Sequence, residues 1–440
     1  MKGKTITRRQ GLQAALLGAG AVGLRALATG LPPAFLLNPR RALADGTACG
    51  TNGKAQYIIL STSGNGDPIN ASVPGTYEDS NIVHSPDPTM APTSLTIGGQ
   101  KHTAAAPWAT LPQSVLDRTC FWHLMSNTTV HPKEPDVLKL MGATAAGEML
   151  PSLLAGQLAP CLGTIQSQPI SLGASGPSEG LSYGGTPQPI IPAPALKATL
   201  TSAPGALTDL QALRDQTMNQ LYDLYKNGAT PAQRAFVDSM VTSQQQVRNI
   251  NQSLLDALTS IKDNSVASQL LAAVTLIQMK VTPVIAIHIP FGGDNHTDNG
   301  LAAETTQTVS GVAAIASLMQ QLATAGLTDQ VTLMSLNVFG RTLGPGNTNG
   351  RTHNPNHQVS FTIGKPFKGG VIGGVAPVGG DYGATAIQST TGASDPTGGD
   401  VSTVNTLAAF GRTMLAAVGV PPATIATSVP AGAVITGALA

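Results

Sequence analysis

Two polar loops in the second half of the chain carry side chains that bind metal ions. One loop contains Asp294 and His296, two positions apart, and the other contains His353 and His357, four positions apart. Carboxylates and imidazoles are ligands of divalent cations such as Zn²⁺, Ca²⁺ and Mg²⁺, and a bound cation polarises phosphoryl or sulfuryl oxygens and activates water. The alternative is that both loops are hydrogen-bonded turns, in which Asp and Asn are common.

Two further side chains follow apolar runs and extend the same chemistry. Asp67 comes after the run 56–62 in a turn rich in Gly and Asn, and we predict it as a further metal ligand, with a plain turn as the alternative. Arg341 follows the run 331–336. Because a planar guanidinium binds an oxyanion through two parallel hydrogen bonds, we predict Arg341 as a catalytic residue that contacts a charged substrate group.

The segment after a third apolar run, 120–125, carries hydroxyl groups. Thr128 and Thr129 are candidate nucleophiles, and the sequence does not decide between them. His131 stands at the same predicted strand end. His123 lies inside the apolar run, and we interpret it as a core histidine.

A strand–helix–strand pattern positions these side chains. A β-branched run at 281–289 precedes the aspartate loop, a helical pattern covers 301–325, and an apolar run covers 331–336. Strands that alternate with helices predict a parallel α/β sheet. Ligands of such sheets bind beyond the carboxyl ends of the strands, where both polar loops begin. We therefore expect six side chains to meet in one cleft: Asp294, His296, Asn337, Arg341, His353 and His357.

Other segments predict insertions around this core. Residues 163–203 are rich in Gly, Pro and Ser, and helical patterns follow at 207–226 and 230–258. These helices either pack against the sheet or form a small cap, and we interpret 163–263 as an insertion or cap. A final helix is expected over 402–418.

The N-terminal segment has the pattern of a twin-arginine export signal. Adjacent arginines at positions 8 and 9 precede a moderately apolar stretch, and an Ala-Leu-Ala cleavage sequence ends at residue 44. We predict 1–44 to be a signal peptide that directs the folded protein to the periplasm or the extracellular space, leaving 45–440 as one α/β domain. The alternative is an uncleaved N-terminal helix, against which Arg25 and the cleavage sequence argue.

The charge of the mature part argues against binding to nucleic acid. Residues 1–44 hold seven of the 24 basic residues and no acidic residue, so 17 basic residues face 23 acidic ones in the remainder, a net charge of −6. No integral membrane span is expected after cleavage. Three cysteines match no zinc motif, and an oxidising compartment allows one disulfide whose pair the sequence does not assign: Cys49, Cys120 and Cys161.

Four features occur in order: the arginine pair, a Gly-Asn-Gly-Asp turn at 64–67, a Gly-Asp-Asn-His loop at 293–296, and Asn-Val-Phe-Gly-Arg-Thr at 337–342 with Gly-Arg-Thr-His at 350–353. Together they resemble an uncharacterised family of exported bacterial proteins with the sulfatase/alkaline-phosphatase-like fold, whose motifs are G-x-D-T-H, E-F-G-R-T and G-R-D-H. The resemblance covers nearly the whole mature chain. It implies a three-layer α/β/α fold with a mainly parallel sheet and helical and loop insertions. It also implies a divalent-metal site with four candidate ligands: Asp67, Asp294, His296 and His353.

Two positions depart from the family pattern. The acidic residue before F-G-R-T is Asn337 here, displaced by one because Val338 intervenes, and the aspartate of the D-H pair is Thr352. The resemblance implies a metal-dependent hydrolase of phosphate or sulfate esters, acting on a small-molecule ester or an envelope component. The alternative is a catalytically degenerate relative that serves as a binding or assembly protein of the cell envelope, and the two missing carboxylates favour it.

Overall fold

The computed structural model describes residues 56–164, 166–173, 180–200, 252–344 and 348–440, with isolated positions between 201 and 251. The chain divides into two compact units, one formed by 1–47 with 191–264 and the other by 48–190 with 265–440. The predicted signal peptide lies outside the described residues, as do nearly all of the predicted helix at 207–226 and most of that at 230–258. None of the helices in the described part is both long and apolar enough to cross a membrane.

A seven-stranded sheet forms the centre of the larger unit, in the order β13-β4-β12-β9-β1-β8-β5. Its neighbouring strands run parallel except at β12, which is antiparallel to β4 and β9. The strands are β1 (Tyr57–Ser63), β4 (Thr119–Leu124), β5 (Ile170–Ser171), β8 (Val284–Ile287), β9 (Val331–Asn337), β12 (Gln358–Ile363) and β13 (Gly370–Ile372). The predicted α/β class with a mainly parallel sheet is confirmed.

The central strands are buried along their whole length, as their uninterrupted apolar runs predict for parallel strands covered on both faces. β1 pairs with β9 from Tyr57 opposite Val331 to Ser63 opposite Asn337, so the polar segments after both strands begin at the same edge. β8 is shorter than the predicted run 281–289. One reason is Pro283, which has no N–H and so cannot donate to the hydrogen-bond ladder at the start of the strand.

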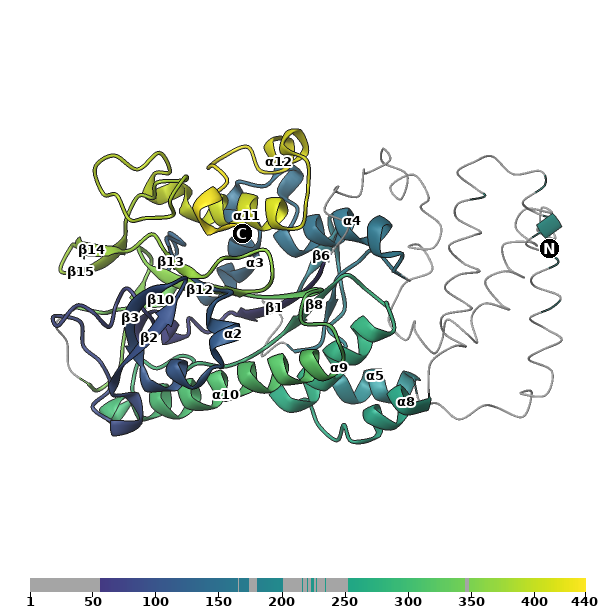
Figure 1. Cartoon of the computed structure of the whole chain (residues 1–440), viewed down its shortest axis with the longest axis horizontal. Helices are drawn as coiled ribbons and strands as arrows, with labels where there is room; N and C mark the ends of the chain where they lie inside the picture. The colour runs from purple at the N-terminus through teal and green to yellow at the C-terminus, as the bar shows by residue number, and fades with distance from the viewer. Residues whose placement is uncertain are drawn as a thin grey trace, which may run out of the picture. The chain divides into compact units, whose positions relative to one another are not determined.

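Helices cover both faces of the sheet and make three layers (Figure 1). On one face, Trp122 of β4 and Phe410 of a covering helix meet edge to face, with ring centroids 5.3 Å apart. The helices of this face are α3 (Glu134–Leu138), α4 (Leu150–Leu162), α11 (Thr406–Ala417) and α12 (Pro422–Ser428). The expected helix at 402–418 is confirmed as α11, preceded by a 3₁₀ turn at Thr403–Asn405.

The opposite face carries α9 (Val266–Gln278) and the long α10 (Ala302–Thr324), shown in green in Figure 1. Phe291, Trp108 and Phe361 pack together beneath α10, with Trp108 stacked 5.8 Å from Phe291. Gly311 lets the helix approach, since an added Cβ would lie 2.8 Å from the Phe291 ring. The predicted helix at 301–325 is therefore confirmed almost residue for residue.

Short ladders join the loops at the carboxyl edge of the sheet. β10 (Gly340–Arg341) pairs antiparallel with β11 (His353–Asn354), which sets Arg341 opposite His353. A hairpin of β14 (Val375–Val378) and β15 (Asp381–Ala384) follows β13, and another, β2 (Pro92–Ile97) with β3 (Gln100–Ala105), precedes β4.

The smaller unit is described in two helical pieces, α5 (Ala193–Leu200) and α8 (Gln252–Thr259). Lys197 of α5 donates hydrogen bonds to the carbonyls of Thr259 and Ile261, both at 2.8 Å, and the N–H of Ala193 donates to Asn264. These contacts tie the two ends of the segment 193–264 to each other.

Candidate metal centre

Four side chains from three separate loops meet at the carboxyl edge of the sheet. His131, Asp294, His296 and His353 each offer one ligand atom, and these atoms all lie within 4.8 Å of one another. Asp294 and His296 belong to the loop after β8, and His353 lies in β11. The structure thus brings three of the predicted ligands together and adds His131, for which the sequence predicts a place at a strand end but no role as a ligand.

The segment after β4 carries His131 into the cluster. Its Asn127 adopts a left-handed conformation (φ 54°), and the Asn127 N–H donates to the Pro355 carbonyl at 2.8 Å. The His131 Nδ1 lies 2.8 Å from the Gly64 carbonyl. Since a carbonyl only accepts, Nδ1 carries the proton, and the lone pair of a neutral His131 is on Nε2, the atom that faces Asp294 at 3.5 Å.

The ring of His353 is oriented in the same way. Its Nδ1 donates to the Thr129 carbonyl at 2.6 Å, so its Nε2 presents a lone pair to the cluster. Partial burial and the nearby charges of Arg341, His131 and His296 lower the pKa of His353, against the hydrogen bond to Thr129, which raises it. A neutral imidazole held by a backbone carbonyl is the arrangement that metal-ligating histidines commonly show.

His296 completes the imidazole set. Its Nε2 lies 2.7 Å from the Nε2 of His353 and 3.5 Å from the Asp294 carboxylate. Because His353 offers a lone pair there, His296 is the donor in this contact and carries its proton on Nε2. His296 must move that proton to Nδ1 before its Nε2 can serve as a ligand.

Arg341 holds the carboxylate of Asp294. Its Nη2 lies 2.9 Å from the Asp294 Oδ1, and the guanidinium is completely buried, while the Asp294 side chain is 48% exposed. Partial burial raises the pKa of Asp294, but the hydrogen bond and charge of Arg341, together with His131 and His296, outweigh it, so the pKa lies below its ordinary value. Asp294 is therefore a fixed anion at the surface of the cluster.

The other donors of Arg341 are directed at backbone carbonyls. Nε donates to Gly66, Nη2 to Asn65 at 2.6 Å, and Nη1 to Arg351 at 3.4 Å. The side chain therefore connects the loop after β1 to the loops of Asp294 and His353. This placement makes Arg341 a positioning residue for Asp294, whereas the sequence suggested contact with a substrate oxyanion.

Phe339 forms the apolar floor of the cluster. The sequence did not predict this role. Its ring lies 4.2 Å from that of His353 and 4.9 Å from that of His131, measured between centroids. The Arg341 guanidinium lies 5.4 Å from the same ring. Two ligand rings and the arginine are thus packed against one fully buried side chain.

Asp67 lies behind the cluster and is not one of its four members. Its carboxylate is completely buried, and neither oxygen has a hydrogen bond of ordinary geometry, although Ser63 and the Gly293 N–H lie nearby. Burial raises the pKa of Asp67, with His288 as the main opposing charge. The Asp67 backbone pairs with the Asn337 amide in both directions, at 3.2 and 2.7 Å, so Asn337 fixes the loop after β1.

His357, a predicted ligand, points into the protein core. Its Nε2 lies 2.9 Å from the Nδ1 of His123, whose Nε2 donates to the Pro74 carbonyl at 2.9 Å. The two rings stack with centroids 5.1 Å apart, and both are fully buried. His357 lies directly before the first residue of β12, a strand of the central sheet, so its side chain is buried in the core. For this reason it does not join His353. His123 is a core histidine, as expected.

The predicted nucleophiles lie beside the cluster. Thr129 contributes its carbonyl to His353, and the Thr128 hydroxyl accepts a hydrogen bond from the Val130 N–H at 3.3 Å. Thr129 is exposed and Thr128 half-buried. Thr352, at the position of the missing aspartate, is exposed as well.

The donor set fits a divalent transition-metal ion. Three imidazole nitrogens and one carboxylate oxygen are the donors that Zn²⁺ commonly takes, whereas Ca²⁺ and Mg²⁺ prefer shells made of oxygen. Two of the imidazoles are already held in the required tautomer by carbonyls. A His/Asp group that can hold a metal ion is thus present.

Comparisons with known proteins give a family and no activity. Neither the curated proteins nor the solved structures contain a significant match to the chain. A protein-family model does match, over residues 187–429, which is more than half of the 440 residues. The matched region includes Asp294, His296, Arg341 and His353. The chain therefore belongs to the family described as "Protein of unknown function (DUF1501)".

Proposed function

We propose that this protein binds one divalent transition-metal ion through His131, Asp294, His296 and His353, and that it is an exported metal-dependent hydrolase of phosphate or sulfate esters. The convergence of these four side chains carries the proposal. Three further points support it: the resemblance to the sulfatase/alkaline-phosphatase-like family, the three-layer fold, and the position of the cluster at the carboxyl edge of the strands.

The electrostatics of the cluster favour an anionic substrate. A bound cation supplies Lewis-acid polarisation of an ester oxygen and lowers the pKa of water. The negative charge of Asp294 is already offset by Arg341 at 2.9 Å, and the histidines are neutral ligands. The positive charge of the ion would then remain largely uncompensated, which attracts phosphate or sulfate groups.

A non-catalytic binding protein is the second candidate, and one observation favours it. Four protein ligands fill a tetrahedral zinc site, whereas catalytic zinc sites keep one position for water. Asn337 and Thr352 also stand where the related family has carboxylates. In this alternative the ion serves to hold the three loops together for binding or assembly in the cell envelope.

Metal content of the purified mature protein is the first test. We expect one zinc ion per chain, lost in the double variant Asp294→Ala, His296→Ala and retained in His102→Ala, a control histidine that pairs with Glu78 at 3.6 Å. Metal-free wild-type protein that is folded and indifferent to added Zn²⁺ or Co²⁺ would end the metal proposal.

Hydrolysis assays then separate the enzyme from the binding protein. The zinc-loaded protein should release p-nitrophenol from p-nitrophenyl phosphate or p-nitrophenyl sulfate, and the double variant should not. Stoichiometric zinc without turnover of either ester would reject the hydrolase and favour the envelope-binding alternative.

Export through the twin-arginine route is part of the same proposal. The arginine pair at positions 8 and 9 and the cleavage sequence that ends at residue 44 support it. Cys161 is disulfide-bonded while Cys120 is a buried free thiol. A disulfide suits the periplasm or extracellular space because those compartments are oxidising.

A further inference from the structure

A buried ion pair lies next to the cluster without contributing a ligand. Arg351 and Glu304 face each other through two contacts, Nε to Oε2 at 2.7 Å and Nη2 to Oε1 at 3.1 Å, and their side chains are only 3% and 1% exposed. Arg351 also donates to the carbonyls of Thr342 at 2.9 Å and Val83 at 2.7 Å. Such a pair pays a large desolvation cost, so stability alone is a weak reason for its presence.

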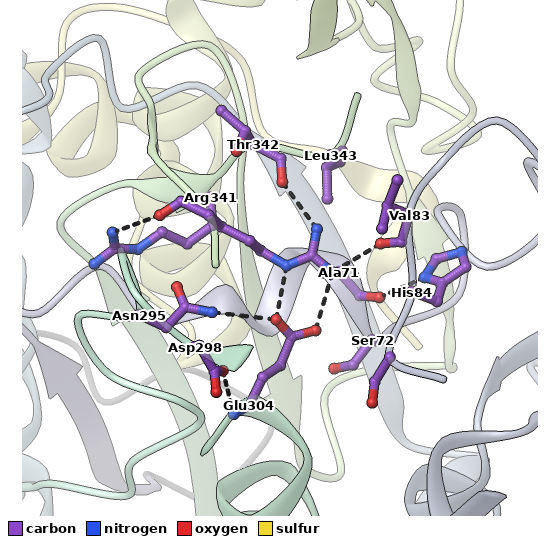
Figure 2. A network of polar contacts seen from close by, with 12 residues as sticks. Ala71, Ser72, Val83, His84, Asn295, Asp298, Glu304, Arg341, Thr342 and Leu343 are labelled. Carbon is purple, nitrogen blue, oxygen red and sulfur yellow. Dashed lines mark hydrogen bonds and ion pairs between the residues drawn. The ribbon is translucent and has the colours of Figure 1, made fainter. Parts of the chain in front are cut away.

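The pair contacts the aspartate loop through the residue between two ligands. Figure 2 shows the Asn295 amide directed at the Glu304 carboxylate, with Nδ2 and Oε2 3.3 Å apart. The Asn295 carbonyl in turn accepts the Arg351 N–H at 3.0 Å. Since Asn295 stands between Asp294 and His296, the ion pair is connected to the backbone that carries both ligands.

The same pair contacts the histidine loop. Arg351 is two residues before His353, and its carbonyl accepts a hydrogen bond from Arg341, which also holds Asp294. The loops approach so closely at Gly350 (φ 131°) that an added Cβ would lie 2.3 Å from the His296 carbonyl oxygen. The two ligand loops are thus in close contact at Gly350, and the buried Arg341 guanidinium bridges Asp294 to the Arg351 backbone.

Helix α10 anchors this connection to the sheet. Asp298 accepts the N–H of Ala303 at 2.8 Å. It also accepts the N–H of Glu304 at 3.0 Å (Figure 2), and the two bonds cap the first turn of the helix. A carboxylate at a helix N-terminus is stabilised by the backbone donors there. Glu304 therefore projects from a capped helix. Its contacts with Asn295 and Arg351 fix the two ligand loops relative to that helix.

We propose that the Arg351–Glu304 ion pair, with Asn295, is the positioning device that sets the metal ligands of the two loops at binding distance. None of the three touches the ion; they act through Asp294, His296 and His353. This inference depends on the proposed metal site. In this arrangement, helix α10 sets the geometry of the ligands.

The test measures Zn²⁺ affinity in Glu304→Gln and Asn295→Ala. The first substitution weakens the ion pair with Arg351 and the second removes the Asn295–Glu304 hydrogen bond, and neither replaces a ligand residue. We expect affinity to fall by about 10- to 100-fold, the range for groups that orient metal ligands. At saturating Co²⁺, the visible absorption band of each variant should differ from wild type in position or intensity, because the coordination geometry has changed. Loss of stability alone would not alter that spectrum.

Phe410→Leu is the matched control, since Phe410 packs edge to face against Trp122 in the buried core on the other face of the sheet. It should lower the unfolding temperature and leave Zn²⁺ affinity and the Co²⁺ spectrum unchanged. If both test variants bind Zn²⁺ with the affinity of the wild type and show its Co²⁺ spectrum, the positioning role is overturned and the metal site is not. Wild-type protein that binds no metal would overturn the metal site and this inference together.

Discussion

The histidines of this protein divide by their hydrogen-bond partners into ligands and core groups. His131 and His353 each donate Nδ1–H to a carbonyl and keep a lone pair for the cluster. His123 and His357 instead form a buried chain in which each nitrogen has a neighbour. Residue type alone does not separate the two groups, because the distinction depends on which atoms lie beyond each ring nitrogen.

The buried pair gives a prediction for stability at low pH. Burial lowers the pKa of His123 to about 4 and that of His357 well below its ordinary value. Unfolded histidines take up protons below about pH 6.5, while these two stay neutral in the folded protein, so stability is complete above that pH and falls as the pH drops toward 4. His123 alone should cost about 3 kcal/mol over this interval, at about 1.4 kcal/mol per pKa unit.

Urea denaturation between pH 4 and 7.5 measures this effect. In His123→Gln, the unfolding free energy should fall less steeply with falling pH than in the wild type. The difference in slope should be at most that expected for the uptake of one proton. An unchanged slope in the variant would show that the buried histidine is not responsible for the acid sensitivity.

At the scale of elements, the glycine turn after β1 sets the approach of Phe339 to the cluster. Gly66 has φ 68°, and an added Cβ would lie 1.9 Å from the Phe339 ring. Gly66→Ala should therefore lower the unfolding free energy by roughly 2–5 kcal/mol, through left-handed strain and overpacking of the core. Displacement of Phe339 should also weaken metal binding, because two ligand rings rest on it.

Gly379→Ala provides the comparison for this substitution. Gly379 has φ 59°, but no atom lies within 4 Å of an added Cβ, so only the conformational cost of about 1–2 kcal/mol applies. Both variants are measured by denaturant unfolding and by Zn²⁺ titration. Equal losses in the two would mean that contact with Phe339 contributes nothing.

The sequence predicted those elements whose signals are local. The strands around 56–62 and 331–336 and the helix over 301–325 have long, regular patterns, and each appears within a residue or two. β12 was missed although its run Gln358–Ile363 alternates polar and apolar residues, a pattern typical of a half-buried strand; in the structure every one of these residues is buried. Its antiparallel direction turns the chain so that His357 enters the core and His353 stays outside.

The site was predicted in part for the same reason. Asp294, His296 and His353 follow strands or belong to recognisable loops, so their common edge could be anticipated. His131 lies in the segment after β4, a strand that two others separate from β1, and no local pattern reveals that this segment folds back over that distance. The bonds that hold Arg341 inside the protein are likewise tertiary contacts without a sequence signature.

At the scale of the whole molecule, the export proposal makes the remaining prediction. Replacing the arginines at positions 8 and 9 by lysine should leave the precursor in the cytoplasm, whereas the wild-type protein should be recovered from the periplasm or medium starting at Asp45. Cell fractionation and N-terminal mass spectrometry give the answer. Wild-type protein retained in the cytoplasm, or processed at another site, would contradict the assignment of 1–44.

The ligands of the cluster are far apart along the chain, and this has a consequence for folding kinetics. His296 and His353 are 57 positions apart, and His131 lies on the far side of β8 and α9 in chain order. Contacts between such distant segments form late, because closing long loops costs entropy that only the completed core repays. The ion would meet its full donor set only at the end of folding. The rate of metal uptake by refolding protein would then report the completion of the native topology, and not the formation of any single helix or strand.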